Sequence, residues 1–115
     1  MKKEILIYKA LLNINYIGNI YFGGGTPSLC PGAVIEIIEF MKSNFNINGE
    51  IGMEANPLPV SDTPIYDTFQ KGGVSKVSIG VQTFDKELLA KVNRQFKADS
   101  AYEAIRILLD KGFYI

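Results

Sequence analysis

The sequence predicts an α/β fold with a parallel sheet, and three features of the chain support this. Apolar segments of about five residues alternate with amphipathic segments of roughly ten or more. Glycine, proline and helix-capping residues separate these segments. Polar residues follow the apolar segments, where strands would end. Strands that alternate with helices form a parallel sheet with right-handed connections, because each helix carries the chain back across the sheet.

Composition narrows the class of protein. The chain has 115 residues, of which 47% are hydrophobic and 21% charged, as in a single globular domain. Twelve basic and twelve acidic residues balance, so no net charge would attract nucleic acid or an anionic membrane. We find no apolar run long enough to cross a bilayer and no cleavable signal at the start. We therefore expect a cytoplasmic protein with no nucleic acid partner and no transmembrane segment.

Cysteine and histidine usage limits the metal sites. Cys30 is the one cysteine, and the chain contains no histidine. This excludes an internal disulfide framework and any zinc or iron–sulfur site built by this chain alone. We interpret Cys30 as a small loop residue beside Pro31, because neither a base nor a second thiol accompanies it.

The first part of the chain is predicted to form a helix, a strand and a second helix. The spacing of Ile5, Tyr8, Leu11 and Leu12 indicates an amphipathic helix that ends before Asn13. A strand opens at the glycine that follows and runs into three consecutive glycines. The next helix begins at a proline suited to the first helical turn. Its buried face is predicted to comprise Val34, Ile37, Ile38, Met41 and Phe45.

The middle of the chain repeats this plan. Residues 46–49 are predicted to form a turn, and residues 50–55 a second strand. Pro57 ends this strand, because proline lacks the N–H that a central strand requires. Residues 61–62, Ser-Asp, suit the N-cap of a third helix, and the two glycines at 72–73 close it.

The last part is predicted to add a strand and two helices. Residues 74–81 are rich in β-branched side chains and indicate the third strand, and residues 85–92 indicate a short helix. Residues 100–103 have capping-box spacing for a final helix, which Gly112 ends. Residues 113–115 would begin a fourth strand. The buried stripe of the final helix is predicted to comprise Ala104, Ile105, Leu108 and Leu109.

Polar residues gather where such a sheet would bind a ligand. Thr26 follows the first strand, Glu54 and Asn56 end the second, Gln82 ends the third and Arg94 lies just beyond. Ligands bind at the carboxyl ends of parallel strands in α/β proteins. A carboxylate, a hydroxyl, amides and a guanidinium on one rim suit a zwitterionic or ribose-bearing ligand, with Arg94 paired to a carboxylate.

The glycines at 23–25 would form a floor for this ligand. Without Cβ atoms, their backbone groups can approach a bound molecule closely and adopt positive φ. The run is neither a dinucleotide fingerprint nor a Walker loop, since the last glycine of the first and the Gly-Lys-Ser/Thr of the second are missing. An ordinary strand-to-helix turn is an equally open interpretation.

Each polar residue also has a purely structural interpretation. Glu54 could be an exposed charge at a strand end, and Asn56 could form a side-chain turn before the proline. Gln82 could cap the helix that starts near Asp85, and Arg94 could be a solvated surface residue. Their coincidence on one rim favours binding.

Four motifs follow one another along the chain. They are Ile-Tyr-Phe-Gly-Gly-Gly-Thr-Pro-Ser from Ile20, Glu-Ala-Asn-Pro from Glu54, Val-Ser-Ile-Gly-Val-Gln-Thr-Phe-Asp from Val77 and Val-Asn-Arg from Val92. Together they resemble the radical S-adenosylmethionine (SAM) proteins of the oxygen-independent coproporphyrinogen III oxidase family, which includes a haem-chaperone branch. The resemblance covers nearly the whole chain.

The resemblance implies a partial (β/α) TIM-like barrel in which residues 1–115 are an internal segment of a radical SAM core. This segment would hold about three complete β-α units preceded by a helix. The cofactors implied are SAM and a [4Fe-4S] cluster, from which a deoxyadenosyl radical is generated. No catalytic or metal-binding residue is carried over. The SAM contacts carried over from the family motifs are Gly24, Gly25, Thr26, Glu54, Gln82 and Arg94.

The chain departs from the family in lacking the cluster-binding cysteines, the later strands of the barrel and the C-terminal domain. The cluster-binding C-x-x-x-C-x-x-C segment is absent, so the chain resembles an internal fragment. One cysteine cannot replace three, and we expect no radical chemistry from this chain alone. The unpaired edges of an incomplete barrel are expected to favour self-association.

Two hypotheses about function follow from the resemblance. The chain is either the SAM-binding segment of an oxidase-like protein of porphyrin metabolism or part of a module that carries haem or another small molecule without turnover. Porphyrin or haem would then be the partner besides the cofactor. Ser28 after Thr-Pro and Ala55 within Glu-Ala-Asn-Pro resemble the haem-chaperone branch more than the oxidase. A β-α scaffold without a ligand is the third alternative.

Overall fold

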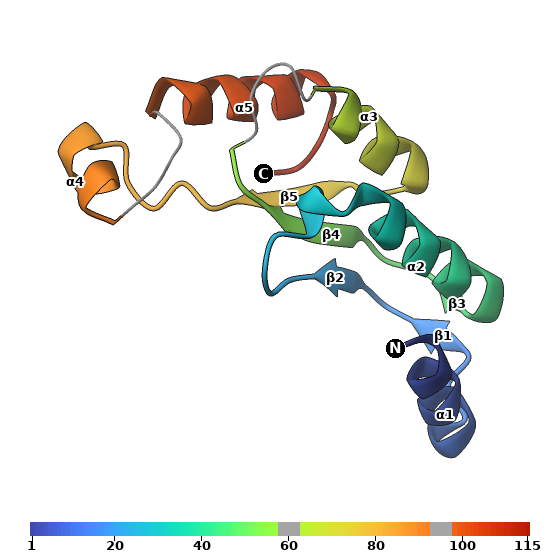
Figure 1. Ribbon diagram of the computed structural model, residues 1–115. Coiled ribbons are helices and arrows are strands. Elements are labelled where there is room, and N and C mark those ends of the chain that lie inside the picture. The colour runs from blue at the N-terminus through green and yellow to red at the C-terminus, as the bar shows by residue number, and fades with distance from the viewer. Residues whose placement is uncertain (58–62, 93–97) are drawn as a thin grey trace.

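A computed structural model describes residues 1–57, 63–92 and 98–115 of the chain (Figure 1). Strands and helices alternate along it, which confirms the predicted α/β class. The helices are α1 (Lys2–Leu12), α2 (Pro31–Asn44), α3 (Thr63–Gly72), α4 (Lys86–Lys91) and α5 (Ala98–Asp110), with a 3-10 turn η1 (Pro27–Leu29). The strands are β1 (Tyr16–Ile17), β2 (Ile20–Phe22), β3 (Asn46–Ile47), β4 (Ile51–Ala55) and β5 (Lys76–Ile79).

The main sheet is parallel and has the strand order β2-β4-β5. Strands that are consecutive in this sheet are also connected in sequence through α2 and α3, as in the wall of a (β/α) barrel. The predicted fourth strand is present as one parallel bridge between Lys76 and Tyr114. The backbone N–H of Val77 donates to the carbonyl of Tyr114 at 2.8 Å, so the end of the chain extends the sheet beside β5.

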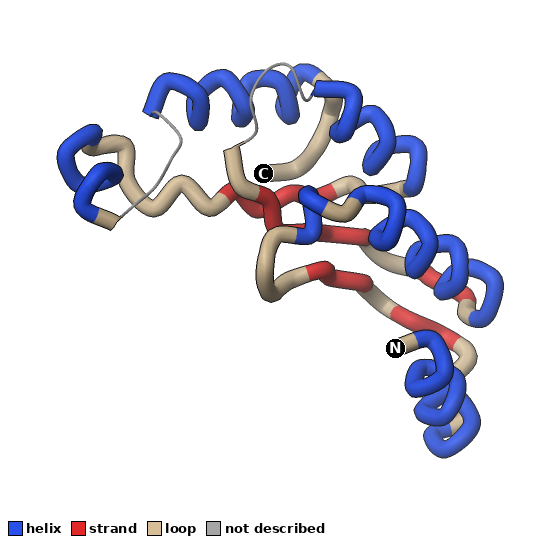
Figure 2. The backbone as a smooth tube through the Cα atoms, viewed as in Figure 1, coloured by secondary structure: helices blue, strands red, loops and turns tan. Residues whose placement is uncertain are grey.

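A second parallel pair, β1 with β3, lies at the amino ends of β2 and β4 (Figure 2). The prediction of a turn over residues 46–49 is therefore wrong for Asn46 and Ile47, which pair with Tyr16 and Ile17. A strand of two residues that starts with asparagine has no periodicity to reveal it, and only pairing with a distant segment makes it a strand.

Gly49 lies where the β3–β4 segment accommodates one residue more than the β1–β2 segment with which it pairs. Ile17 faces Ile47 and Ile20 faces Ile51, so the β3–β4 segment holds one residue more than the β1–β2 segment. An extra residue on one strand bends it locally, as in a β-bulge. At this bend a Cβ on Gly49 would overlap the carbonyl oxygen of Gly18 and the side-chain oxygen of Asn19. That asparagine oxygen accepts the N–H of Glu50 at 2.8 Å and fixes the crossing.

The core lies between the sheet and the helices α2, α3 and α5, which cover one of its faces (Figure 1). Ile51, Met53 and Ala55 alternate along β4 and are buried against these helices. Burial of apolar surface is the main force that stabilises such a layer, at about 25 cal/mol per Å². The helical residues of the core cluster are Val34, Ile38, Tyr66, Phe69 and Leu108.

Two details of α5 differ from the prediction. The helix begins at Ala98, so Ser100 lies in its first turn and is not the N-cap of a capping box. Leu109 is 57% exposed, whereas Ala101 and Ala104 are buried. The predicted burial of Ala104 and Leu108 is confirmed, Ile105 is half-buried, and the stripe extends to Ala101 in place of Leu109, since residues three and four positions apart share one face of a helix.

Helix α1 ends as predicted, with Asn13 in the left-handed conformation (φ 51°). Its apolar stripe is not buried: Tyr8, Leu11 and Leu12 are exposed, and Ile5 is half-buried. Two lysines hold this helix against α2. Lys2 pairs with Glu36, and Lys9 lies 5.0 Å from the centre of the Phe45 ring. Self-association through exposed surfaces such as this one stays a prediction. In the described part of the chain, every helix is too short or too polar to span a membrane.

We predict that Gly49→Ala destabilises the fold by about 1 to 3 kcal/mol, because its Cβ would meet backbone atoms that cannot move without breaking the strand register. Gly18→Ala is the matched control, since a Cβ there has no atom within 4 Å. The measurement is urea unfolding of both variants. Equal free energies of unfolding would show that the crossing of the two segments is not constrained in this way.

Candidate functional site

A cavity of about 370 Å³ lies at the carboxyl ends of β2, β4 and β5. Four residues predicted as ligand contacts line it, contributed by three successive β-α units. Gly25 and Thr26 follow β2, Glu54 belongs to β4 and Gln82 follows β5. The parallel sheet brings these residues together although they lie far apart in sequence. The cavity is lined by Gly25, Thr26, Glu54, Ala55, Asn56, Ser78, Ile79, Gly80 and Gln82.

The remaining two predicted contacts are Gly24 and Arg94. Gly24 is next to the lining residues but not among them, and its φ of +94° requires a residue without a Cβ. Arg94 lies outside the described residues. The structure thus gathers four of the predicted contacts, gives the fifth a backbone role in shaping the loop, and leaves the sixth a prediction.

The glycine loop is shaped to fit Glu54. A Cβ on Gly23 would lie 3.4 Å from the Oε1 atom of Glu54, so the carboxylate rests against the loop. A Cβ on Gly25 would have no atom within 4 Å, so this side of the loop is open. Glu54 is the one ionisable side chain among the lining residues, and the cavity therefore carries negative charge. Such a site favours a ligand with a cationic group.

Asn56 links two of the strand ends. Its amide Nδ2 donates to the hydroxyl of Thr26 at 3.2 Å, across 30 positions of sequence. Asn56 was placed on the rim by sequence analysis but not among the cofactor contacts. Ser78 and Gly80 were missed altogether. The register pairs Glu54 with Ser78, so the alternation of side chains along β5 is the signal that could have identified Ser78.

Gln82 has a strained backbone. Its φ is +69°, and the N–H of Thr83 donates to the carbonyl of Val81 at 2.9 Å. This three-residue turn with positive φ is rare and strained. Residues in such conformations cluster at binding and active sites. The alternative that Gln82 caps the following helix is wrong. Asp85 is the N-cap and accepts the N–H groups of Glu87 and Leu88 at 2.8 and 3.0 Å.

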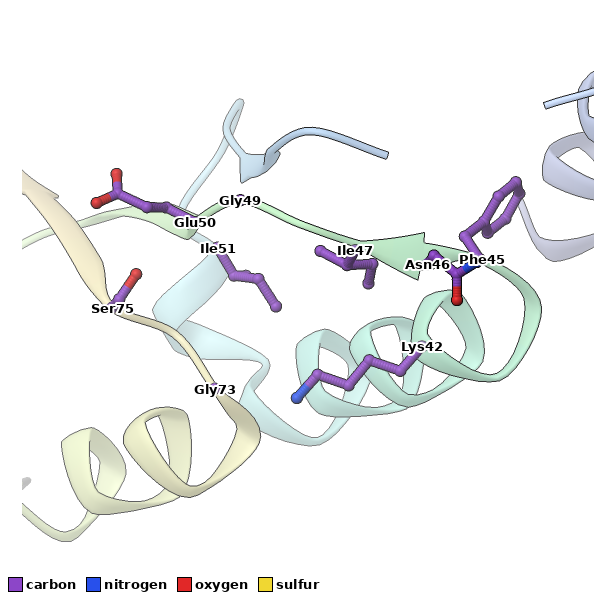
Figure 3. Close-up of a pocket in the computed structure, with 9 residues that line it drawn as sticks. All are labelled: Lys42, Phe45, Asn46, Ile47, Gly49, Glu50, Ile51, Gly73 and Ser75. Carbon is purple, nitrogen blue, oxygen red and sulfur yellow. The ribbon is translucent and has the colours of Figure 1, made fainter. Parts of the chain in front are cut away.

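A larger hollow, of about 570 Å³, lies at the opposite, amino ends of the strands (Figure 3). The charged side chains that line this hollow, Lys42 and Glu50, do not point toward one another. Lys42 donates to the carbonyl of Gly72 at 2.9 Å, which satisfies the end of α3, and the Glu50 carboxylate points away from it (Figure 3). The set of polar groups that converge on one cavity is at the carboxyl ends, where parallel sheets bind ligands.

A model of the radical SAM superfamily matches residues 2–115. The chain belongs to this superfamily. Heme chaperone HemW of Buchnera aphidicola subsp. Schizaphis graminum is 35% identical over 109 residues, which cover 90% of this chain and 29% of the relative. Oxygen-independent coproporphyrinogen III oxidase of Salmonella typhimurium is 28% identical over 116 residues, which cover 98% of this chain and 25% of the relative.

The solved structure of Escherichia coli coproporphyrinogen III oxidase (HemN), described as a radical SAM enzyme, superposes with a TM-score of 0.82 at 24% identity. The match covers 97% of this chain and 26% of HemN. It confirms the predicted partial TIM-like barrel. The sequence matches are to relatives of the HemN/HemW type, and this chain spans between a quarter and three tenths of the length of those two relatives.

Membership of the superfamily implies SAM and a [4Fe-4S] cluster as cofactors, and the residues fit these two groups differently. The negatively charged cavity, with its glycine floor, hydroxyl and amides, suits SAM, which carries a sulfonium and an ammonium group. Thiolates hold such clusters, and Cys30 is the one thiol of the chain. Among the described residues no three metal-binding side chains converge. The residues present do not fit the cluster.

Gly24 and Gly25 differ in a way that stability measurements can detect. We predict that Gly24→Ala destabilises the chain by about 1 to 2 kcal/mol, because alanine is strained at a φ of +94°. Gly25→Ala should leave stability almost unchanged, since its Cβ enters open space. Thermal unfolding of the two variants without ligand tests this. If both lose the same stability, the difference in backbone conformation is refuted.

Proposed function

We propose that this chain forms the SAM-binding part of a radical SAM protein that acts in porphyrin or haem metabolism. The observation that carries the proposal is the cavity in which Gly25, Thr26, Glu54 and Gln82 converge from three successive β-α units. These are the family contacts that sequence analysis carried over, and they come from motifs separated by about 25 to 30 residues. If each of these residues had only a local structural role, there would be no reason for all four to line the same cavity.

Each residue has a chemical role in this proposal. The Glu54 carboxylate accepts hydrogen bonds from the ammonium group or the ribose hydroxyls of SAM. Gly24 and Gly25 keep the backbone close to the methionine end, and Thr26 and Gln82 offer a hydroxyl and an amide. Arg94, beyond the described residues, pairs with the carboxylate of the ligand.

When bound and reduced, the iron–sulfur cluster of radical SAM proteins supplies the electron that cleaves SAM. The part of this chain in that chemistry is to bind and orient SAM. Its single cysteine cannot hold the cluster, and the chain alone is not expected to cleave SAM.

Within the HemN/HemW type, a haem-carrying function is the second candidate. It is favoured by the 35% identity to a heme chaperone, against 28% to an oxidase. The two candidates differ in what the full-length protein does with its ligand. A chaperone binds haem stoichiometrically and transfers it unchanged, whereas an oxidase converts coproporphyrinogen III. Titration with haem, followed by an assay of coproporphyrinogen consumption, separates them.

We predict that Glu54→Gln weakens binding of SAM to the full-length protein by about tenfold, since it removes the negative charge of the cavity. A charge-assisted hydrogen bond is worth about 1.5 to 3 kcal/mol, and the exposure of Glu54 places it at the lower end. Glu50→Gln is the matched control, an exposed glutamate that directly precedes the same strand and lies away from the cavity. Calorimetric titration with SAM measures both. Unchanged affinity in Glu54→Gln would remove the central contact of the proposal.

Arg94→Ala is expected to weaken SAM binding by at least a few fold, because the ligand carboxylate loses its charged partner. Arg106→Ala on the exposed face of α5 is the control. Iron content is measured alongside the titration, since loss of a SAM contact should leave the cluster in place. If Arg94→Ala binds SAM as Arg106→Ala does, Arg94 is a surface residue.

A further inference from the structure

We propose that Asn56 is a positioning residue of the ligand site: its amide fixes the Thr26 hydroxyl so that the hydroxyl proton is donated to a carboxylate of the ligand. The inference rests on the proposed function, because it assigns a role within the same SAM site. It adds two statements to the proposed function. Asn56 acts on the ligand only through the Thr26 side chain, and the site selects a ligand that carries a carboxylate.

The geometry begins with the hydrogen bond from Nδ2 of Asn56 to Oγ1 of Thr26 at 3.2 Å. Both residues line the cavity, and both are partly buried. A threonine hydroxyl has one proton and two acceptor positions. Because the amide N–H occupies one acceptor position, the proton of the hydroxyl is not needed for the contact with Asn56. It is free to point into the cavity.

The oxygen end of the Asn56 amide lies beside Gly80. Its Oδ1 would lie 3.5 Å from a Cβ on Gly80, and Nε2 of Gln82 would lie 3.6 Å from the same position. The Asn56 oxygen and the Gln82 nitrogen thus both lie near Gly80, while the donor nitrogen of Asn56 contacts Thr26. The backbone below is also fixed, since the N–H of Gly80 donates to the carbonyl of Ala55 at 2.9 Å.

The cavity therefore has one part that attracts cationic groups, at Glu54, and another that can bind a carboxylate, at Thr26. Glu54 lies against the glycine loop and attracts cationic groups. A ligand carboxylate would be repelled there and requires donors elsewhere. Thr26 provides such a donor, and a hydroxyl that itself accepts a hydrogen bond donates more strongly, because hydrogen bonds in a chain polarise one another. Asn56 therefore favours a ligand that carries a carboxylate over the same ligand without it.

The experiment is a double-mutant cycle in the full-length protein with two ligands, SAM and its decarboxylated analogue. We expect Asn56→Ala to weaken SAM binding about three- to tenfold, the range of a net hydrogen bond of 0.5 to 1.5 kcal/mol. In a Thr26→Val background the same change should have almost no further effect. Neither variant should alter binding of the decarboxylated analogue by more than about twofold. Asn48→Ala, an exposed asparagine of the β3–β4 segment, is the control.

A second variant guards against a folding defect. Asn56→Leu keeps about the same side-chain volume and removes the donor nitrogen without adding a charge, and should give the same preferential loss of SAM. Equal losses for both ligands, or a full effect of Asn56→Ala in the Thr26→Val background, would overturn the role of Asn56 while the SAM site stands. If the unaltered protein binds neither ligand, the proposed function fails, and this inference fails with it.

Discussion

The position of β4 between β2 and β5 is the constraint on which the rest of the structure depends. Its Ile51, Met53 and Ala55 are buried against the helices, and the alternate residue Glu54 faces the other side and reaches the cavity. A shift of the register by one residue would exchange these two sets and remove core and site together. The same strand thus contributes both to the core of the fold and to the charge of the site.

Small residues allow the layers and loops to approach this strand. A Cβ on Gly52 would lie 2.9 Å from the ring of Tyr21, so the glycine makes room for the tyrosine of the neighbouring strand. At Gly23 a Cβ would only touch the Glu54 carboxylate, at 3.4 Å. Two of the positive φ angles of the described residues, those of Gly24 and Gln82, lie beside the cavity. Such conformations persist where the surrounding structure holds them in place. The hydrogen bonds donated by the Asn56 side chain and by the Gly80 N–H are next to these residues.

Sequence and structure together relate the chain to radical SAM proteins of the HemN/HemW type. The matches cover nearly the whole chain, including the β-α units that build the candidate site. The chain contains a single cysteine, so the proposed SAM site and the thiolates of a cluster would be formed by different residues. Variants of the rim can therefore be assessed by ligand affinity with iron content as an independent measure.

The sequence by itself determined the α/β class, the order of the main strands and helices, and the residue types on the rim, because these depend on local periodicity, capping and turn chemistry. It could not reveal β3, whose two residues become a strand only by pairing with β1, nor the burial of Ala101 in place of Leu109. The tertiary structure also decided which polar groups meet. Asn56 and Thr26 touch because adjacent parallel strands end at the same edge of the sheet, and no local signal encodes a contact between residues 30 positions apart.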